Sequence, residues 1–327
     1  MTQDSTIALH SKVNDLLRDT PREQLACAAS RWAVGTGLFG SHHDPRTPHA
    51  YAKALEVAST FVGLCSLPTA PHDRLVHATR LVMLFLWLDD VADDERLSAS
   101  DWRSFHAELK LLTDGTPPSR SPGHEEWFAW LATVRDWGAR VPGSCAVFLQ
   151  ALAAFFDGLD AERARRGAAV DRETYFAIRR ETIFFKVFAE YWRVSLSVDL
   201  APEYEHEVEP LRDLGCDVTI ISNDIGSVIR ERADEDLNVV FQIARDRSCS
   251  SDEAIGVAID DHNEKIVQYR ALRKALESRH SNHHLSTYLE ILDVQVTGNL
   301  DSMLALVDRY PECAPHIGRL QRIRESG

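Results

Sequence analysis

The helical spacing of apolar residues constrains the fold more than any other feature of this sequence. From about residue 71 to 90, apolar side chains recur mostly at every third or fourth position, the period of one helix face. No stretch of useful length alternates between apolar and polar residues as a strand would. Further helices are predicted over about 21–34, 50–65, 101–112, 124–138, 143–166, 171–198, 207–233, 250–277 and 283–307. The sequence therefore predicts an all-α bundle of about ten helices, one domain over 1–327 with flexible ends at 1–20 and 312–327.

The composition is that of a soluble globular protein. Of the 327 residues, 44% are hydrophobic and 26% are charged, which is enough apolar material for a substantial core. The net charge of −14 argues against nucleic acid as a partner, because nucleic acid phosphates bind basic surfaces. The six cysteines are scattered without the spacing of zinc ligands, so we expect reduced thiols.

The sequence contains no recognisable targeting or membrane segment. The N-terminal residues lack a basic stretch followed by an apolar core, so no signal peptide is predicted. The most apolar run, Leu81–Leu88, is too short to cross a bilayer. We therefore expect a cytoplasmic protein without membrane insertion, and a homodimer stays open.

A polar ladder is predicted on the helix that includes residues 223–231. At roughly 100° per residue, Asn223, Ser227 and Glu231 lie on one face, with Arg230 beside them and the apolar residues opposite. Three hard oxygen donors on successive turns suit a cation such as Mg2+ that shares its shell with phosphate oxygens. The arginine would bind the same phosphates. An ordinary amphipathic helix with a solvated face is the alternative.

An acidic cluster follows the apolar stripe of the preceding helix. The stripe that contains Phe85 continues to Asp89 and Asp93, with Asp90 adjacent. Carboxylates crowded on an inward face repel one another unless cations neutralise them, which favours a metal site. Alternatively, the helix has left the core by Asp89 and these acids are solvated.

Two adjacent arginines lie in the most aromatic predicted helix. Arg179 and Arg180 precede Phe184, and Trp192 follows in the same segment. Arginines in such surroundings need an anionic partner, which could be a substrate or an internal carboxylate. The aromatic rings could stabilise a cation through their π-faces or simply pack in the core.

Together these segments make the chain resemble a bacterial class I terpene synthase from about residue 20 to 311. Asp89–Asp93 is similar to the aspartate-rich motif of that family, and Asn223–Glu231 to its second metal motif, with Arg230 where lysine is commoner. Arg180 lies where the family has its diphosphate sensor, and Arg309–Tyr310 where an Arg-Tyr pair closes over the diphosphate. Five motifs in register, including Gly298–Leu300, make the resemblance specific.

The resemblance implies a helical bundle with a central active-site cavity and an enzyme that ionises and cyclises a linear all-trans prenyl diphosphate. The substrate would be geranylgeranyl or farnesyl diphosphate, with about three Mg2+ ions as cofactor. The metal ligands it implies are Asp89, Asp90, Asp93, Asn223, Ser227 and Glu231. The substrate-binding residues are Arg180, Arg230, Arg309, Tyr310, Phe85 and Trp192. The groups acting in catalysis are Arg180, Arg309, Tyr310 and the backbone carbonyl of Phe184.

Two departures from the family pattern bear on substrate and product. A glycine is common where this chain has Phe184, and tryptophans are common where it has Gln295 and Ser302. The roof of the pocket should therefore be less aromatic and roomier, which tilts the expectation towards the C20 substrate. The product skeleton, and whether water quenches the final cation, stay open.

Three other functions compete with this interpretation. A chain-elongating prenyltransferase shares the fold but would carry a second aspartate-rich motif in place of the ladder. A metal phosphohydrolase of the HD type is suggested by His43-Asp44 and His72-Asp73, although both doublets lie in loop-like sequence beside prolines. A non-enzymatic helical scaffold would leave the three separated motifs unexplained.

Overall fold

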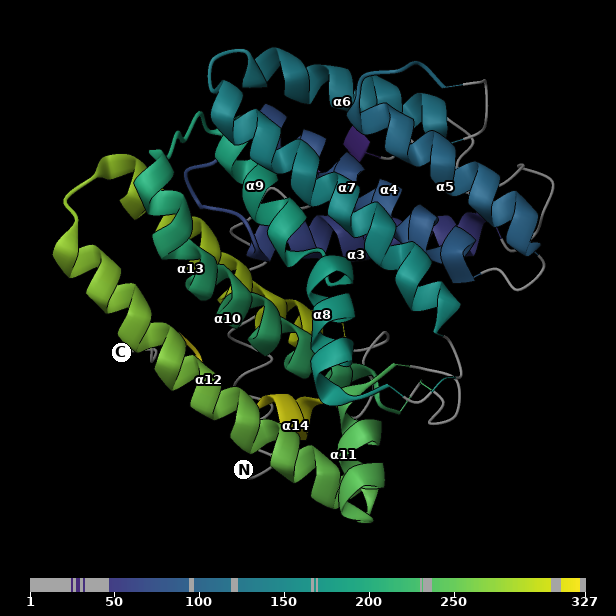
Figure 1. Cartoon of the computed structure of the whole chain (residues 1–327), viewed down its shortest axis with the longest axis vertical. Coiled ribbons are helices and arrows are strands. Elements are labelled where there is room, and N and C mark those ends of the chain that lie inside the picture. Colours follow the sequence, from purple (N-terminus) through teal and green to yellow (C-terminus); the bar gives the residue numbers. More distant parts are fainter. Residues whose placement is uncertain are drawn as a thin grey trace.

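In the computed structural model, the described residues are 25, 28, 29, 32, 47–93, 97–118, 123–165, 168, 170–229, 231, 237–306 and 313–323. All regular structure in these ranges is helical (Figure 1). The helices are α3 (Thr47–Leu64), α4 (His72–Asp93), α5 (Ala99–Thr113), α6 (His124–Gly138), α7 (Pro142–Ala164), α8 (Arg172–Thr182), α9 (Phe185–Ser195), α10 (Pro202–Ser227), α11 (Val239–Arg247), α12 (Ser251–Arg279), α13 (His283–Ala305) and α14 (Ala314–Ile317).

The helices form a bundle, and several of them together enclose a central cavity. α12 lies along one side of the bundle, with α10 and α13 next to it, while α5 and α6 lie at the opposite side (Figure 1). α10 packs against α12, α13 and α8, and α7 packs against α8 and α9. α3 lies between α4 and α13. The core between them is continuous and rich in aromatic side chains.

The predicted helix over 171–198 is broken in two. α8 ends at Thr182, and α9 begins at Phe185 after Phe184 adopts a left-handed backbone with φ of 69°. A side chain in this conformation costs about 1–2 kcal/mol, so the surrounding packing has to compensate. No glycine or proline marks the break, which is why helical periodicity alone predicted one helix.

Several other boundaries differ from the prediction. α10 begins at Pro202 rather than 207, because proline is well tolerated in the first turn of a helix, and it includes Pro210. It ends at Ser227 rather than 233. The short helices α11 and α14 were not predicted. Residues 313–323, expected to be part of a flexible end, pack on the core with four side chains buried: Cys313, Ile317, Leu320 and Ile323.

α7 is the one described helix that is long and apolar enough to cross a membrane, by length and composition alone. It contacts α5, α6, α8 and α9, and its side chains Phe148, Leu152 and Phe156 are fully buried. These contacts are those of a core helix in a bundle.

His77 on α4 is enclosed by aromatic rings. Its imidazole stacks on Trp130 at 4.5 Å between centroids, lies 5.8 Å from the ring of Tyr191 and meets Trp137 edge-on at 4.7 Å. Neither ring nitrogen has a hydrogen-bond partner among the described residues. Burial, reinforced by the positive charge of Arg80, lowers the pKa of His77 to about 3. His77 is therefore neutral in the folded protein at ordinary pH.

We expect His77 to make the protein sensitive to mild acid. Its pKa is lower in the folded state than in the unfolded chain, so protons bind preferentially to the unfolded chain. The free energy of unfolding is therefore unaffected by this residue above about pH 6.5 and decreases as pH falls towards 3. Between pH 7 and pH 5, the free energy of unfolding of the wild-type protein should fall by about 2 kcal/mol more than that of His77→Phe. Urea unfolding at both pH values measures this, with His206→Gln as an exposed control. An unchanged pH dependence in His77→Phe would contradict the assignment.

Candidate active site

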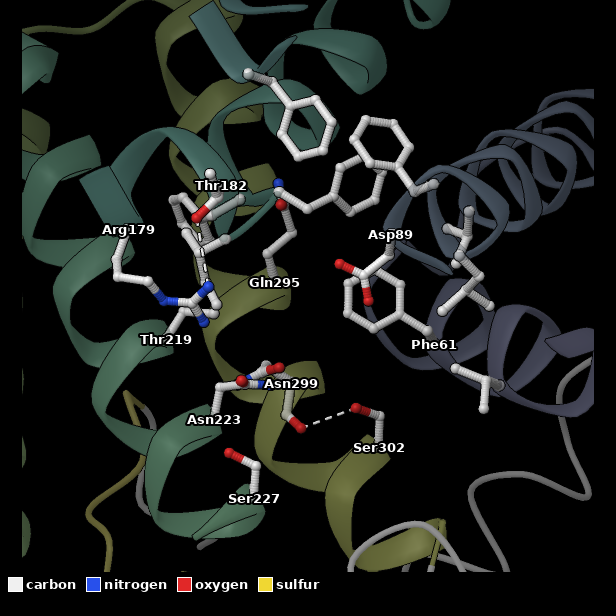
Figure 2. Close-up of a pocket in the computed structure, with 18 of the residues that line it drawn as sticks. Phe61, Asp89, Arg179, Thr182, Thr219, Asn223, Ser227, Gln295, Asn299 and Ser302 are labelled. Atoms are coloured by element: carbon white, nitrogen blue, oxygen red, sulfur yellow. Dashed lines mark hydrogen bonds between the residues drawn. The ribbon is translucent and has the colours of Figure 1, made fainter. Parts of the chain in front are cut away.

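A cavity of about 440 Å³ lies at the centre of the bundle (Figure 2). Oxygen- and nitrogen-bearing side chains line one part of it, and aromatic and aliphatic side chains line another. The polar lining residues are Asp89, Glu162, Arg179, Thr182, Thr219, Asn223, Ser227, Glu231, Gln295, Asn299 and Ser302. The apolar lining residues are Val57, Phe61, Val82, Phe85, Leu86, Phe155, Ile183, Phe184, Phe185, Leu237 and Leu306.

The predicted ladder at the end of α10 faces this cavity. Asn223, Ser227 and Glu231 all line it, although Glu231 follows the end of the helix. The backbone N–H of Glu231 still donates to the carbonyl of Ser227 at 3.2 Å, which continues the helical path. Glu231 Oε2 accepts a hydrogen bond from Asn238 Nδ2 at 2.7 Å, and this orients the carboxylate. Thr219, four residues before Asn223, adds a rung that the sequence analysis missed although the spacing of four could have revealed it.

The acidic cluster approaches the same cavity from α4. Val82, Phe85, Leu86 and Asp89 line it, so the apolar stripe does lead to a carboxylate. Asp90 is exposed and does not line the cavity. Asp93 is the last residue of α4, and its side chain lies outside the described part of the chain. Of the two acids whose side chains the structure describes, Asp89 lines the cavity and Asp90 does not.

The two adjacent arginines of α8 point in different directions. Arg179 lines the cavity, where Nη1 lies 3.3 Å from Glu162 Oε1 and 3.3 Å from Thr182 Oγ1 (Figure 2). Arg180 does not line the cavity. Its Nε and Nη2 donate to Asp217 at 2.7 and 3.0 Å. A rotation of about 100° between consecutive residues explains the divergence. The family resemblance implies that Arg180 senses the diphosphate, but in this structure Arg179 lines the cavity and Arg180 does not.

Arg179 presents a partly exposed guanidinium to the cavity. Its Nε has no hydrogen-bond partner among the described residues, and 14% of its side chain is exposed. Burial alone would lower the pKa of Arg179. The negative charges of Glu162 and Asp224, together with other neighbours, raise the pKa by more than burial lowers it, so the net shift is upward. The guanidinium is therefore a permanent positive charge at the cavity wall.

The side chain of Asp224 links α10, which carries the ladder, to α8 and α11. Its carboxylate accepts from the Tyr175 hydroxyl and, at 2.8 Å, from the backbone N–H of Val239, and it lies 3.8 Å from Nη2 of Arg179. Burial raises the pKa of Asp224 to about 7, with Arg179 opposing the rise and Glu231 adding to it. This residue sits beside Asn223 in sequence but points away from the cavity lining.

Five of the eleven apolar residues that line the cavity are phenylalanines. The ring of Phe184 lies 3.7 Å from that of Phe85 and 6.3 Å from that of Phe61, and Phe85 lies 4.4 Å from Phe155. Phe184 therefore fills space where the family pattern usually has glycine. Trp192, proposed as substrate-binding, does not line the cavity. It is fully buried and packs edge-on against Phe188 and Tyr191, as core.

A second polar stripe comes from α13. Gln295, Asn299 and Ser302 recur at spacings of four and three, and all are nearly buried. Asn299 Nδ2 donates to Ser222 Oγ on α10 at 3.0 Å, and Ser302 Oγ donates to the carbonyl of Asn299 at 2.8 Å. Gln295 and Ser302, at positions where the family resemblance implies tryptophan, line this wall with polar side chains.

Three of the expected site residues, Arg230, Arg309 and Tyr310, lie outside the residues that the structure describes. Their roles stay predictions.

The donor set at the cavity suits a hard divalent cation. Amide, hydroxyl and carboxylate oxygens from Asn223, Ser227 and Glu231 converge on one side, and Asp89 supplies a carboxylate from another helix. Within the described ranges, no three His, Cys, Asp or Glu side chains gather into a metal-sized group. The chemistry of the set is that of Mg2+ rather than of zinc.

The chain belongs to the terpene synthase family. The family described as "Terpene synthase family 2, C-terminal metal binding" matches residues 80–268, more than half of the chain. Germacradien-4-ol synthase from Streptomyces citricolor shares the fold, with a TM-score of 0.73 at 20% identity, over 87% of this chain and 94% of that chain. The predicted all-α class I terpenoid synthase fold is confirmed, and the family match implies metal binding.

Curated relatives are similar over part of their length. Delta(6)-protoilludene synthase 8 from Postia placenta is 25% identical over 221 residues, which are 64% of this chain and 63% of that protein. Germacrene A synthase from Nostoc punctiforme is 30% identical over 162 residues, 48% of this chain and 47% of that protein. The match thus spans less than two thirds of the length of either relative.

The two arginines of α8 provide a matched pair for a binding test. Arg179→Gln should weaken Mg2+-dependent binding of inorganic diphosphate by at least about 10-fold, because it removes a charged donor from the cavity. Arg180→Gln, the same change one residue along, should alter affinity by less than about 3-fold. Isothermal titration calorimetry measures both. A reversed order would assign the diphosphate to Arg180 instead.

Proposed function

We propose that this protein is a Mg2+-dependent terpene cyclase that ionises a linear all-trans prenyl diphosphate and closes the resulting cation into a ring. One observation carries this proposal: a single cavity has oxygen donors on α4 and α10, an arginine on α8 and an aromatic group in its apolar lining. A diphosphate and a hydrocarbon chain need these two environments side by side.

The polar part of the cavity would hold the leaving group. Asn223, Ser227 and Glu231 would bind metal on one side, and Asp89 would bind it on the other. When bound, Mg2+ supplies Lewis-acid neutralisation of the departing diphosphate without a proton donor. Arg179 would donate from its partly exposed guanidinium to a diphosphate oxygen, and this binding would orient the scissile C–O bond towards the aromatic wall.

The apolar part would hold the prenyl chain and the cation. Phe61, Phe85 and Phe184 line this part, where a ring face would attract positive charge and the rings would exclude water. The backbone carbonyl at the break between α8 and α9 adds a dipole near the reacting chain, as the family resemblance implies for Phe184. Its left-handed backbone supports this role, since such strain persists where the surrounding structure requires it.

Other parts of the proposal rest on the resemblance. We assign diphosphate sensing to Arg179 in place of Arg180, and we keep Arg230, Arg309 and Tyr310 as additional diphosphate ligands. About three Mg2+ ions, a single domain over the whole chain and a cytoplasmic location complete the proposal. Neither nucleic acid nor a membrane is required, and a homodimer remains compatible.

The competing functions find less support. A chain-elongating prenyltransferase would need carboxylates where α10 carries Thr219, Asn223 and Ser227. For a phosphohydrolase, His72 and Asp73 do begin helix α4 rather than lying in a loop, but they are absent from the cavity lining. Asp73 is about 24 Å from Asp89 along the axis of the same helix.

Replacing the proposed metal ligands tests the function directly. Wild-type protein with Mg2+ should convert farnesyl or geranylgeranyl diphosphate to a cyclic product, detected by gas chromatography with mass spectrometry. Asp89→Ala or Asn223→Ala should lower turnover by at least about 100-fold, because a metal ligand is lost, with unchanged far-UV circular dichroism. Asp73→Ala removes an exposed carboxylate from the same helix and is the matched control. Retained turnover in both ligand variants would refute the site.

Phe184 should limit the length of the substrate. Its ring closes the cavity against Phe85, so we favour the shorter C15 chain over the C20 chain expected from sequence. Phe184→Gly keeps the left-handed turn without strain and removes the ring. The ratio of kcat/KM for geranylgeranyl over farnesyl diphosphate should rise by at least about 5-fold. Phe148→Leu, a core change outside the lining, is the control. An unchanged ratio would mean that Phe184 does not set chain length.

A further inference from the structure

One carboxylate in the cavity lining has no part in the proposed reaction. The charged side chains of the described lining are Asp89, Glu162, Arg179 and Glu231. Asp89 and Glu231 are proposed metal ligands, and Arg179 is the proposed diphosphate ligand. Glu162 remains, and a carboxylate in a cavity that receives an anion opposes the binding of that anion by charge repulsion. Its position beside the arginine offers an explanation.

Glu162 lies in the last turn of α7 and faces Arg179 on α8. Its Oε1 accepts a hydrogen bond from Nη1 of Arg179 at 3.3 Å, the long end of the range for such bonds. The side chain of Glu162 is 29% exposed, so solvent reaches this ion pair. Burial lowers the pKa of Arg179, and Glu162 comes first among the neighbours that raise it. Glu162 is therefore the main counter-charge of the arginine, in a contact that a ligand can displace.

Asp224 is a neighbour of a different kind. Its carboxylate lies 3.8 Å from Nη2 of Arg179, but it is 1% exposed and accepts hydrogen bonds from Tyr175 and from the backbone N–H of Val239. A carboxylate held in this way stays in place when a ligand binds. Asp224 thus supplies a fixed counter-charge, whereas Glu162 has a partly exposed and flexible side chain that can leave the arginine.

Glu162 occupies a donor that the diphosphate needs. Nη1 of Arg179 carries two hydrogens, and it lies 3.3 Å from Thr182 Oγ1 as well as from Glu162 (Figure 2). Protein groups can therefore use both hydrogens of this nitrogen. Nε of the same guanidinium is buried. A diphosphate oxygen reaches the arginine through its terminal nitrogens, so the diphosphate and Glu162 are alternative acceptors for Nη1.

We propose that Glu162 is a displaceable counter-ion of Arg179, which pairs with the guanidinium in the empty cavity and yields it to the diphosphate. This role rests on the proposed function and deepens it. Diphosphate oxygens replace the Glu162 carboxylate as acceptors when the ligand arrives with its cations, and Glu162 turns towards water. When the diphosphate leaves, Glu162 takes the donor back. The residue therefore weakens diphosphate binding and favours release of this product.

The direction of a change in affinity tests the role. Glu162→Gln keeps the size of the side chain and removes its charge, so it should tighten the binding of inorganic diphosphate with Mg2+ by at least about 5-fold. Glu162→Ala, which removes the whole carboxyl group, should change affinity in the same direction. Isothermal titration calorimetry measures both. Loss of a metal ligand or of a support for Arg179 would weaken binding instead, so weaker or unchanged binding by Glu162→Gln would overturn the inference.

A double-mutant cycle shows whether the effect acts through Arg179. In protein that carries Arg179→Gln, adding Glu162→Gln should change the affinity by less than about 2-fold. Equal tightening with and without Arg179 would mean simple charge repulsion and would overturn the competition for the guanidinium.

Glu181→Gln on α8 is the matched control. Glu181 is 33% exposed, lies 3.1 Å from Lys186 and does not line the cavity, so the same loss of charge should alter the affinity by less than about 2-fold. The wild-type protein separates the two levels of the account. If it binds no diphosphate with Mg2+, the proposed function fails and this inference fails with it. Wild-type binding that Glu162→Gln does not tighten overturns this inference alone.

Discussion

The active-site architecture depends on the buried carboxylate of Asp224. It accepts hydrogen bonds from Tyr175 on α8 and from the first backbone N–H of α11, and it lies beside Arg179. An ionised carboxylate at 1% exposure would be costly without these partners. The interaction therefore fixes the end of α10, the start of α11 and the inner face of α8 relative to one another. The ladder and the arginine are arranged before any ligand binds.

The separation of polar and apolar surface within one cavity follows from this arrangement. α10 and α13 contribute amides and hydroxyls, whereas α3, α4 and α7 contribute mainly aliphatic and aromatic side chains. Hydrogen bonds between the two polar helices, such as that from Asn299 to Ser222, satisfy part of the buried polar surface. Two of the buried polar atoms without a hydrogen-bond partner among the described residues, Arg179 Nε and Thr219 Oγ1, belong to side chains that line the cavity, whereas others, such as the ring nitrogens of His77, lie away from it.

Helix periodicity predicted the fold class, most helix positions and the ladder, because each depends on residues within a few turns. Asp89 could be located in the same way, as the continuation of an apolar stripe. The choice between Arg179 and Arg180 could not, because it depends on whether Asp217 or the cavity lies opposite each side chain. The break at Phe184 and the core position of Trp192 depend likewise on packing between helices distant in sequence. Thr219, in contrast, could have been predicted from sequence, because it precedes Asn223 by the same four residues that separate Asn223, Ser227 and Glu231.

The most direct test of this account is a crystal structure of the protein with Mn2+ and inorganic diphosphate, using anomalous scattering to locate the metal. The account predicts anomalous peaks within coordination distance of the oxygens of Asn223, Ser227 and Glu231 and of Asp89, with a diphosphate oxygen hydrogen-bonded to Arg179. Metal bound away from these side chains, or diphosphate held by Arg180 outside the cavity, would contradict it.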